Sequence, residues 1–371
     1  MKILFVIHNL QVGGAEILVT NYLLKLKGMG HDVSLVQLWN INSFLKNKLI
    51  DNKISIHTLS FNCPINIFNR IIRKILTVLK KTSYEKKLNK VISKLKPDAV
   101  HVHTGELLLD IINFQNLFYT FHTDVDRTLK YAQPGFRISL ENKINRGLKI
   151  IVLSEKLKVQ VLDFFPNADV TAISNGIDVN AIKAKKINRE QFLNSIGVPQ
   201  DAFILGHVGR FHPVKNHEKI ITVFSAVLKR KPNSYLLLVG GANKKRLKTL
   251  KRLAKEKNVI DKIIFLGERK DATEIMSIFD CFILPSIREG FSLVLCEAEA
   301  HNIRAVATTE VPDEVIINDN CFKLNINESD DKWVDYILGD FTETHNKTIE
   351  SVDINLAVKK HIALYEKGVR K

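Results

Sequence analysis

The sequence predicts an α/β protein made of two doubly wound domains, each built on a parallel sheet. Short apolar runs alternate with helical segments along nearly the whole chain, which is the pattern of βαβ units. The alternation begins twice, at residues 2–7 and again at 203–208, each time as an apolar run followed by a glycine-bearing turn and a helix. The length of 371 residues also exceeds one ordinary domain and fits two of similar size.

The composition indicates a packed globular protein with an anionic partner. Hydrophobic residues make up 45% and charged residues 25%, which argues against a disordered chain. The formal net charge is +16, which favours nucleic acid, an acidic membrane face or a phosphorylated substrate as the partner. The four cysteines form no CxxC pair and are expected to be reduced thiols. No run is long enough for a signal-peptide core or a membrane span, so we expect a cytosolic protein.

The first half opens with a strand at residues 2–7, whose near-continuous apolar run is typical of a parallel strand covered on both faces. Further strands are predicted at 33–38, 99–103, 117–122, 149–153 and 170–174, and helices at 15–27, 107–114, 136–148 and 154–165. We place the end of this domain at Ser174, because residues 175–200 turn polar and lose periodicity.

The turn after the first strand carries Gly13 and Gly14. Backbone amides can approach a phosphate there, because no Cβ stands in the way. The turn is not a dinucleotide fingerprint, since Ile17 stands where the third glycine belongs. A plain tight turn explains the two glycines equally well.

Two predicted strands of this half end in histidine, at the edge where open α/β sheets bind ligands. His122 is the stronger candidate for a role on a transferring group, and His103 for a structural role. Asp124 and Asp126 look like a metal-binding Asp-x-Asp, but we interpret them as loop and helix-start acids.

Residues 66–96 combine a dense basic face with an apolar stripe at helical spacing. They hold ten Lys or Arg against a single acid, Glu85, and the stripe consists of Ile67, Ile71, Ile75, Leu76 and Leu79. A helix lying on anionic lipid headgroups and a packed surface helix with a solvated charged face explain this pattern equally well. Nucleic acid is a weaker partner, because interleaved aromatic residues are missing.

The second half repeats the architecture, with strands predicted at 203–208, 235–239, 263–266, 281–284 and 304–307. Helices are predicted at 217–229, 244–257, 272–279 and 293–300. Arg210 and Lys215 flank the glycine-bearing turn after the first of these strands. A guanidinium and an ammonium at such a turn are suited to phosphate oxygens.

The stretch around residues 284–301 brings a strand end, a polar turn and a helix start together. Gly290 gives a flexible loop position, and Ser292 is predicted to be the N-cap of the helix at 293–300. Glu289 lies in the loop and Glu297 more than one turn inside the helix, so a phosphate bound by the free amides would lie between them. The plainer interpretation is a solvated loop acid and an exposed helix acid.

These pieces resemble the family 4 glycosyltransferases. The resemblance is carried by Gly209-Arg210 with Lys215-Asn216, Glu289-Gly-Phe-Ser-Leu-Val-Leu-Cys-Glu297, Gly13-Gly14-Ala-Glu16 and Asn175-Gly-Ile-Asp178. It implies the GT-B fold: two facing Rossmann-like domains, at 1–174 and 175–353, with a cleft between them. It also implies that the last helix, 354–371, packs back on the first domain.

The resemblance further implies a retaining, metal-independent hexosyltransferase that uses no cofactor. The donor would be a nucleotide sugar, most often a UDP-sugar, and the acceptor a glycan or a polyprenyl-diphosphate-linked sugar. The chain is most similar to members that build bacterial capsule or exopolysaccharide. We therefore expect a cytoplasmic protein, which would be peripheral on the inner face of the plasma membrane if residues 66–96 bind lipid. No nucleic-acid partner is expected.

The resemblance also assigns the site residues. Arg210 and Lys215 hold the diphosphate, Glu289 the donor sugar and Glu297 the ribose. Further donor contacts come from Gly14, His122, Gly290, Phe291, Ser292, Leu293 and Val294. The chain departs from the family pattern at Asn302 and Arg304, where Gly and Pro are usual, and at the turn Gly240-Gly-Ala242. Because Asn tolerates the left-handed conformation, we expect the helix at 293–300 to end normally.

Two other functions fit the sequence less well. One is a nucleotide-sugar epimerase or hydrolase on the same scaffold, and the other is a non-catalytic basic protein that binds nucleic acid or membrane. A nicotinamide dehydrogenase is the weakest alternative, since the glycine fingerprint is missing.

Overall fold

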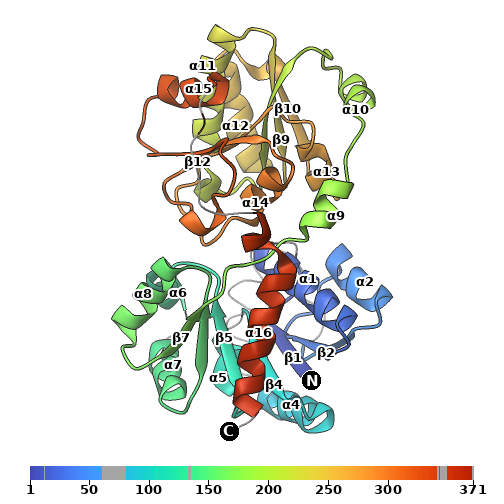
Figure 1. Cartoon of the computed structure of the whole chain (residues 1–371), viewed down its shortest axis with the longest axis vertical. Helices are drawn as coiled ribbons and strands as arrows, with labels where there is room; N and C mark the ends of the chain where they lie inside the picture. Colours follow the sequence, from blue (N-terminus) through green and yellow to red (C-terminus); the bar gives the residue numbers. More distant parts are fainter. Residues whose placement is uncertain are drawn as a thin grey trace. The chain divides into compact units, whose positions relative to one another are not determined.

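The computed structural model describes residues 1–11, 13–60, 81–104, 106–132, 135–340, 342 and 349–369. The chain forms two compact units (Figure 1). Unit 1 comprises Met1–Gly176 together with Ile354–Lys371, and unit 2 comprises Ile177–Asp353. The sequence placed this boundary at Ser174, two residues earlier.

Unit 1 contains a parallel sheet of seven described strands in the order β3-β2-β1-β4-β5-β6-β7. The strands are β1 Lys2–Ile7, β2 Asp32–Gln37, β3 Ser55–Thr58, β4 Ala99–Val102, β5 Leu117–Phe121, β6 Lys149–Val152 and β7 Asp169–Ala172. Its helices are α1 Gly14–Gly28, α2 Phe44–Asp51, α4 Lys81–Leu95, α5 Glu106–Ile111, α6 Val125–Tyr131, α7 Phe136–Ile144, α8 Glu155–Phe164 and α16 Ile354–Val369. The order reverses between β1 and β4, so the loops after these two strands open on the ligand-binding side of such a sheet.

The last helix, α16, completes unit 1 and runs alongside α1 (Figure 1). Tyr365 is fully buried, and its hydroxyl lies 2.7 Å from His101 Nδ1. The amide of Asn116 donates to the carbonyl of Tyr365 at 2.9 Å. A Cβ on Gly368 would lie 1.7 Å from Asn116 Oδ1, so this glycine allows the helix to approach the sheet closely.

Unit 2 contains a parallel sheet of six described strands in the order β10-β9-β8-β11-β12-β13. The strands are β8 Phe203–Val208, β9 Ser234–Val239, β10 Ile263–Gly267, β11 Cys281–Leu284, β12 Arg304–Thr308 and β13 Cys321–Leu324. The order 3-2-1-4-5-6 is that of the Rossmann fold. Its reversal point lies between β8 and β11.

The helices of unit 2 surround this sheet. They are α9 Val179–Ala184, α10 Arg189–Ser195, α11 His217–Arg230, α12 Lys244–Glu256, α13 Ala272–Met276, α14 Leu293–Ala300 and α15 Asp330–Leu338, with short 3-10 turns η1 Pro213–Lys215, η2 Ile260–Lys262, η3 Asp313–Val315 and η4 Ile349–Val352. A continuous apolar core joins α11 and α15 to the strands through Phe224, Leu238, Phe322 and Trp333. This core fixes the start of α11, where candidate site residues lie.

The predicted α/β class and the parallel sheets are confirmed, and β1, β8, β11 and α14 have the predicted bounds. The sequence analysis missed α2, β3, α10, β13 and α15. The polar residues 175–200, which show no periodicity in the sequence, contain the two short helices α9 and α10. Asn302 adopts φ 57° just after α14, so the expected left-handed helix end is confirmed.

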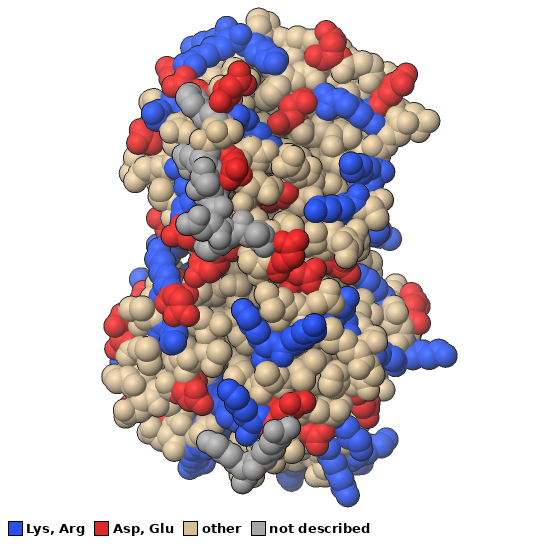
Figure 2. All heavy atoms as spheres, in the orientation of Figure 1, with Lys and Arg blue, Asp and Glu red and all other residues tan. Residues whose placement is uncertain are grey.

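Basic side chains are distributed over both units. On the face shown in Figure 2, Lys and Arg are interspersed with Asp and Glu and do not form one field. Of the basic segment at 66–96, residues 66–80, with the whole predicted apolar stripe, lie outside the described residues. The described part is α4, whose lysines are exposed while Tyr84 and Leu88 are buried. Within the described parts of the chain, no helix has the length and apolarity that crossing a bilayer requires.

Candidate functional site

The candidate site of unit 2 is built from the loops that follow β8 and β11. These strands are neighbours at the reversal point of the sheet, so their loops leave the same edge side by side. The first loop carries Arg210 and Lys215, and the second carries Glu289 and leads into α14. The four residues that the sequence analysis singled out in this half therefore belong to one edge of one sheet.

Two glycines allow the backbone to pack tightly beneath the first loop. Gly240 has φ 149°, and a Cβ there would lie 2.0 Å from the carbonyl oxygen of Gly209. Gly209 N donates to Val239 O, and Phe211 N donates to Gly241 O, both at 2.9 Å. The loop after β8 is thus fixed by backbone hydrogen bonds to the turn after β9. This close backbone approach explains why Gly209 and Gly240 carry no side chain.

The Arg210 side chain is exposed at the start of this loop. It forms no hydrogen bond or ion pair with any residue that the structure describes. An exposed guanidinium with its five donors uncommitted is suited to an anionic ligand.

Lys215 and Glu289 form a partly buried ion pair. Lys215 Nζ lies 2.6 Å from Glu289 Oε1, and the two side chains are 22% and 8% exposed. The contact is possible because Ile287 N donates to Val214 O at 2.8 Å, which joins the two loops. One ammonium has three donors, so Lys215 can hold Glu289 and still bind an anion. A hydroxyl-bearing group could therefore contact Glu289 directly beside that anion.

Helix α14 begins without a side-chain cap. Ser292 occupies the N-cap position, as expected, but the expectation that its side chain caps the helix was wrong, because Oγ accepts no helix amide. The amides of Leu293 and Val294 have no hydrogen-bond partner among the described residues. These free N–H groups and the helix dipole give the start of α14 an affinity for an anion.

Ser292 itself is strained. Its φ of 76° lies in the left-handed region, which costs a residue with a Cβ about 1–2 kcal/mol. Its Oγ is buried and has no partner among the described residues. The expected flexible position, Gly290, is not among the described residues with positive φ, so the loop turns at Ser292. Phe291 is buried beside it and anchors the turn.

Glu297 lies one turn inside α14, where Thr273 Oγ1 donates to its Oε2 at 3.3 Å. Burial raises the pKa of Glu297 to about 7, and the hydrogen bond from Thr273 opposes that rise. The side chain is not fully exposed, so the plainer interpretation of Glu297 as an exposed helix acid was wrong. Glu297 is a carboxylate with acceptor capacity that changes its charge near neutral pH.

Glu299 is a third carboxylate that sequence reasoning missed. It is buried and accepts the amides of Ile317 and Asn318, each at 2.7 Å. Burial raises its pKa to about 7 as well. These contacts join α14 to the loop before β13, so Glu299 fixes the helix and does not face a ligand. The burial of Glu299 could have been predicted from the sequence only by its position on the apolar side of the helix.

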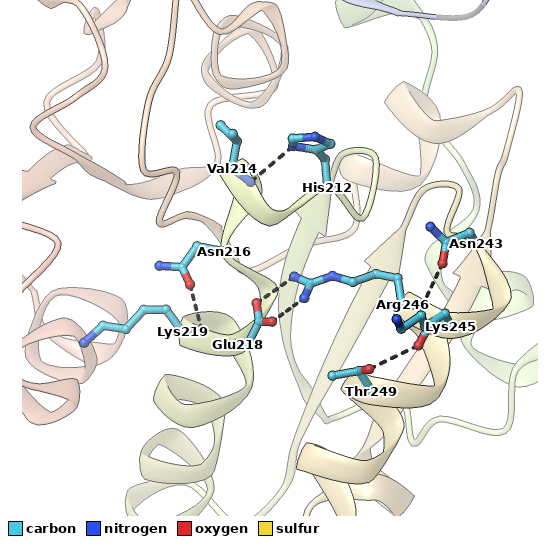
Figure 3. Close-up of polar contacts among 9 residues, drawn as sticks. All are labelled: His212, Val214, Asn216, Glu218, Lys219, Asn243, Lys245, Arg246 and Thr249. Atoms are coloured by element: carbon cyan, nitrogen blue, oxygen red, sulfur yellow. Dashed lines mark hydrogen bonds and ion pairs between the residues drawn. The ribbon is translucent and has the colours of Figure 1, made fainter. Parts of the chain in front are cut away.

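The first turns of α11 and α12 are joined by a forked ion pair (Figure 3). Arg246 donates through both terminal nitrogens to the carboxylate of Glu218, with Nη2 to Oε2 at 2.6 Å. The side chains of Asn216 and Asn243 accept the amides of Lys219 and Arg246, which caps the two helices. The ion pair and the caps thereby fix the helix starts at which the loop with Arg210 and Lys215 and the loop after β9 end.

Two buried histidines lie beneath the first loop and stay uncharged. His207 Nδ1 donates to Ile283 O at 2.8 Å, and its ring meets that of His217 edge-on. Burial lowers the pKa of His207 to about 3 and that of His217 to about 2. The positive charge of this edge therefore comes from Arg210 and Lys215.

In unit 1, Gly14 opens α1 after the loop that follows β1. Gly13 holds the N-cap position, and no side chain caps this helix. A Cβ on Gly14 would meet nothing within 4 Å, so packing within the protein does not require a glycine there. This open space removes one structural explanation for Gly14.

The histidines that follow β4 and β5 lie in contact. His103 Nδ1 and His122 Nε2 are 3.2 Å apart, and His122 is the less buried of the two. Burial lowers the pKa of His122 to about 4. Asp124 caps α6 by accepting Arg127 N at 3.0 Å and also accepts Gln160 Nε2, so it is a helix-start acid as interpreted.

The edge of unit 2 thus combines an uncommitted guanidinium, an ammonium, two free amides and two carboxylates. The cationic and amide groups are suited to a diphosphate. Each carboxylate is suited to the hydroxyls of a group attached to one end of it.

Comparison with known proteins gives two family models that together match most of the chain. "Glycosyltransferase Family 4" matches residues 12–181, and "Glycosyl transferases group 1" matches residues 188–338. EpsF of Bacillus subtilis is 29% identical over 39% of this chain and 38% of its own length. The UDP-Gal:alpha-D-GlcNAc-diphosphoundecaprenol alpha-1,3-galactosyltransferase of Escherichia coli is 23% identical over 64% of this chain and 63% of its own length. In both matches the chain spans less than two thirds of the relative.

Solved structures match over the whole chain. A glycosyltransferase from Rickettsia africae ESF-5 superposes with a TM-score of 0.77 at 19% identity, covering 100% of this chain and 99% of that one. Anabaena HepE in complex with UDP gives a TM-score of 0.73 at 19% identity, covering 99% and 98%. At this identity the likeness establishes a shared fold.

Proposed function

Because this chain belongs to the family 4 glycosyltransferases and has their GT-B fold, we propose that it moves a hexosyl unit from a nucleotide sugar to a glycan or polyprenyl-diphosphate-linked acceptor. We propose that the anomeric configuration is retained, that UDP is the nucleotide, and that the product is a capsule or exopolysaccharide. The E. coli relative is named for UDP-Gal and a diphosphoundecaprenol acceptor, and the HepE structure holds UDP, which supports UDP as the nucleotide and a lipid-linked acceptor. Retention and the polysaccharide product follow from the resemblance to the family alone.

One observation gives the main support for the proposed donor site. Helix α14 begins at a strained, uncapped Ser292 with free amides, directly after the loop whose Glu289 is paired to Lys215. Backbone strain and unpaired amides are costly unless they serve a ligand. In this proposal Arg210, Lys215 and the amides of Ser292–Val294 bind the diphosphate, Glu289 binds the donor sugar, and Glu297 binds the ribose.

Three further contacts of the proposal depend on the family resemblance alone. The amide of Gly14 reaches the donor or the acceptor, His122 contacts the donor sugar, and Gly290 with Phe291 shapes the loop around it. Each contact belongs to the loop after a parallel strand, which is the ligand-binding edge of this fold class.

The reaction breaks the bond between the anomeric carbon and the β-phosphate oxygen and forms a bond from that carbon to the acceptor oxygen. Negative charge develops on the leaving diphosphate, where Arg210, Lys215 and the α14 amides stabilise it. The acceptor hydroxyl approaches on the same face and gives its proton to that phosphate oxygen. This route requires no carboxylate base and no metal ion, and a strict need for added divalent cation would contradict it.

Binding of nucleotides to the intact chain tests the donor site. We expect UDP to raise the Tm, and GDP or ADP to raise it less, because binding to the native state alone stabilises it. Glu289→Gln should keep the UDP shift and reduce turnover of UDP-hexoses more than about 100-fold. Glu256→Gln is the matched control, because Glu256 is a surface partner of Arg252 on α12.

Product analysis separates this function from the alternatives. A transferase forms a glycosidic product only when acceptor is present, whereas an epimerase or hydrolase consumes the nucleotide sugar equally without it. A non-catalytic binding protein would show no turnover, and Glu289→Gln would then change nothing.

We also propose a cytoplasmic protein that is peripheral on the inner face of the plasma membrane. The support is the basic exposed face of α4 and the lipid-linked acceptor named for the E. coli relative. Liposome flotation with and without anionic lipid tests this, with a fourfold Lys→Gln variant at Lys86, Lys87, Lys90 and Lys94. Equal recovery with neutral and anionic vesicles would contradict it.

A further inference from the structure

The proposed function does not explain the contact between His103 and His122, the two histidines that follow β4 and β5. His103 is 2% exposed, and its ring stacks on Phe5 with centroids 5.0 Å apart and an interplanar angle of 8°. His103 Nδ1 lies 3.2 Å from His122 Nε2. His103 Nε2 is buried without a hydrogen-bond partner among the described residues.

Both rings are neutral at physiological pH. Burial lowers the pKa of His122 to about 4 and that of His103 well below its usual value. The neighbouring His101 and His361 add to this, because positive charge on any one ring disfavours charge on the others. Two neutral rings carry one N–H each, so a single proton lies between His103 Nδ1 and His122 Nε2.

The position of that proton follows from the buried nitrogen. If His122 donated from Nε2, His103 would carry its own proton on Nε2, as a buried N–H without an acceptor. If His103 donates from Nδ1, its Nε2 is an unused lone pair. A buried N–H without a partner is rarer and more costly than an acceptor without one. The second arrangement is therefore favoured.

The other polar groups of this cluster do not change the assignment. His101 is engaged at both nitrogens, with Tyr365 Oη and Thr120 Oγ1 each at 2.7 Å. His361 Nδ1 donates to Ala357 O at 2.8 Å within α16. Among the described residues, neither ring forms a hydrogen bond with His103, and the rings of His101 and His103 are tilted against each other with centroids 3.9 Å apart.

We propose that His103 is a positioning residue: it donates its Nδ1–H to His122 Nε2 and thereby holds His122 as the Nδ1–H tautomer. His122 then presents a neutral N–H donor on its less buried side. The tautomer follows from the geometry of unit 1 alone. That this N–H serves a hydroxyl oxygen of the donor sugar depends on the function proposed above.

The tautomer can be read without any ligand. The full chain is labelled with ¹⁵N-histidine, and long-range ¹H–¹⁵N spectra at pH 7.5 identify which ring nitrogen of each histidine is protonated. His122→Gln and His103→Asn spectra assign the two rings. We expect both to carry the proton on Nδ1, which is the tautomer that free histidine populates less. A proton on Nε2 of His122 in the wild-type chain would overturn the proposal.

Two substitutions test whether the tautomer matters for the donor. His103→Asn keeps an N–H donor near the position of Nδ1, whereas His103→Leu removes it. We expect His103→Leu to move the His122 proton towards Nε2 and to raise the donor KM about tenfold with kcat changed less than threefold, the pattern of a lost binding contact. His103→Asn should keep the Nδ1–H tautomer and a KM within about threefold of wild type.

The outcomes distinguish this inference from the proposed function. If the spectra agree but no nucleotide sugar binds or reacts, the glycosyltransferase proposal for the donor fails while the tautomer assignment stands. If the tautomer changes as expected in His103→Leu and the donor KM does not, the positioning role is overturned. Loss of folding in His103→Leu leaves the wild-type and His103→Asn spectra as the decisive measurements.

Discussion

Variants of the Lys215–Glu289 pair should change the free energy of unfolding and the turnover in different ways. Lys215→Met leaves the 8% exposed carboxylate of Glu289 without its cation, and we expect a loss of about 1–3 kcal/mol in the free energy of unfolding. Adding Glu289→Gln should restore most of that loss, because no uncompensated charge remains. Denaturant unfolding of the two single variants and the double variant measures this coupling.

Activity should behave differently in the same variants. Lys215→Met should lower kcat/KM more than about 100-fold, and the double variant should not recover it, because the diphosphate has lost its ammonium and the donor sugar its carboxylate. Recovery of turnover together with stability would show that Lys215 and Glu289 serve the fold alone.

The raised pKa of Glu297 predicts how stability and UDP binding change with pH. Its folded-state pKa, about 7, is above the ordinary value of 4.5, so the stability linked to this group is present below pH 4.5 and is lost as the pH rises through 7. Glu297→Gln should therefore raise the Tm relative to wild type more at pH 8 than at pH 5. Binding of UDP has the opposite trend, because ribose hydroxyls need the ionised acceptor.

Below pH 7 the affinity for UDP should fall more steeply in the wild type than in Glu297→Gln, in which the terminal phosphate of UDP still titrates. Glu299→Gln is the control, because its pKa is also raised to about 7 but its carboxylate faces Ile317 and Asn318. A UDP profile that changes in Glu299→Gln and not in Glu297→Gln would contradict the ribose assignment.

Sequence reasoning singled out the charged residues of the candidate site and missed the features that depend on burial. Arg210, Lys215, Glu289 and Glu297 could be predicted, because their chemical type and their place after strands are visible in the sequence. The left-handed φ of Ser292 could not, because serine is also an ordinary N-cap and the choice depends on packing of the loop. The burial of Glu299 likewise depends on the distant loop before β13.

At the level of elements, the uncapped start of α14 should respond to substitution of its N-cap serine differently from a helix with an ordinary side-chain cap. Ser292→Ala should leave the free energy of unfolding within about 0.5 kcal/mol of wild type, because no cap hydrogen bond is lost. Ser329→Ala, at the start of α15, should cost about 1 kcal/mol, because its Oγ accepts Lys332 N at 3.1 Å. Ser292→Gly should raise stability by up to about 1 kcal/mol by relieving the left-handed strain.

Both changes at Ser292 remove the buried Oγ and should raise the donor KM. If Ser292→Ala destabilised the protein as much as Ser329→Ala, the serine would be a structural cap. The argument for an anion at the start of α14 would then be lost.

Two glycines at strand-to-helix turns should respond in opposite ways to the same substitution. Gly240→Ala should cost at least about 3 kcal/mol, because its Cβ would lie 2.0 Å from Gly209 O at a φ that side chains avoid. Gly14→Ala meets open space and should keep the wild-type Tm. We expect it to reduce turnover at least about tenfold, since the added methyl would obstruct a ligand near the amide. Full activity in Gly14→Ala would show that Gly14 is a plain tight turn.

The elements that could be predicted were apolar strands and periodic helices whose ends are marked by turn residues. β11 ends before Pro285 and α14 ends before Asn302, which gave their bounds. The missed strand β3, Ser-Ile-His-Thr, is mostly polar, and β13, Cys-Phe-Lys-Leu, carries a lysine, so neither forms the continuous apolar run that marks β11. α10 and α15 are short polar helices whose stability comes from tertiary packing, as in the burial of Trp333 by the unit 2 core.

At the scale of the whole molecule, unit 1 depends on a segment from the far end of the chain. Ending the chain after Asp353 removes α16 and exposes Tyr22, whose ring lies 5.2 Å from that of His361. We expect the Tm of unit 1 to fall and that of unit 2 to stay the same. Gly368→Val is the milder variant, since its side chain would collide with Asn116, and the exposed Lys360→Ala is its control.

The two tryptophans allow each unit to be observed separately. Trp39 is 5% exposed in unit 1, and Trp333 is fully buried in unit 2. Single-tryptophan variants, made by changing the other to Phe, should report two thermal transitions. A truncation that shifted both transitions equally would contradict the assignment of α16 to unit 1.

Because unit 1 is completed by the last helix of the chain, it cannot fold fully until synthesis is complete. Residues 1–176 leave the ribosome first, yet the helix that closes over them is translated after all of unit 2. At ordinary elongation rates the delay is roughly 10–40 s. Throughout that time the nascent first unit exposes an apolar groove beside Tyr22 and His101. Chaperones that bind early and release late should therefore matter more for this protein than its modest size implies.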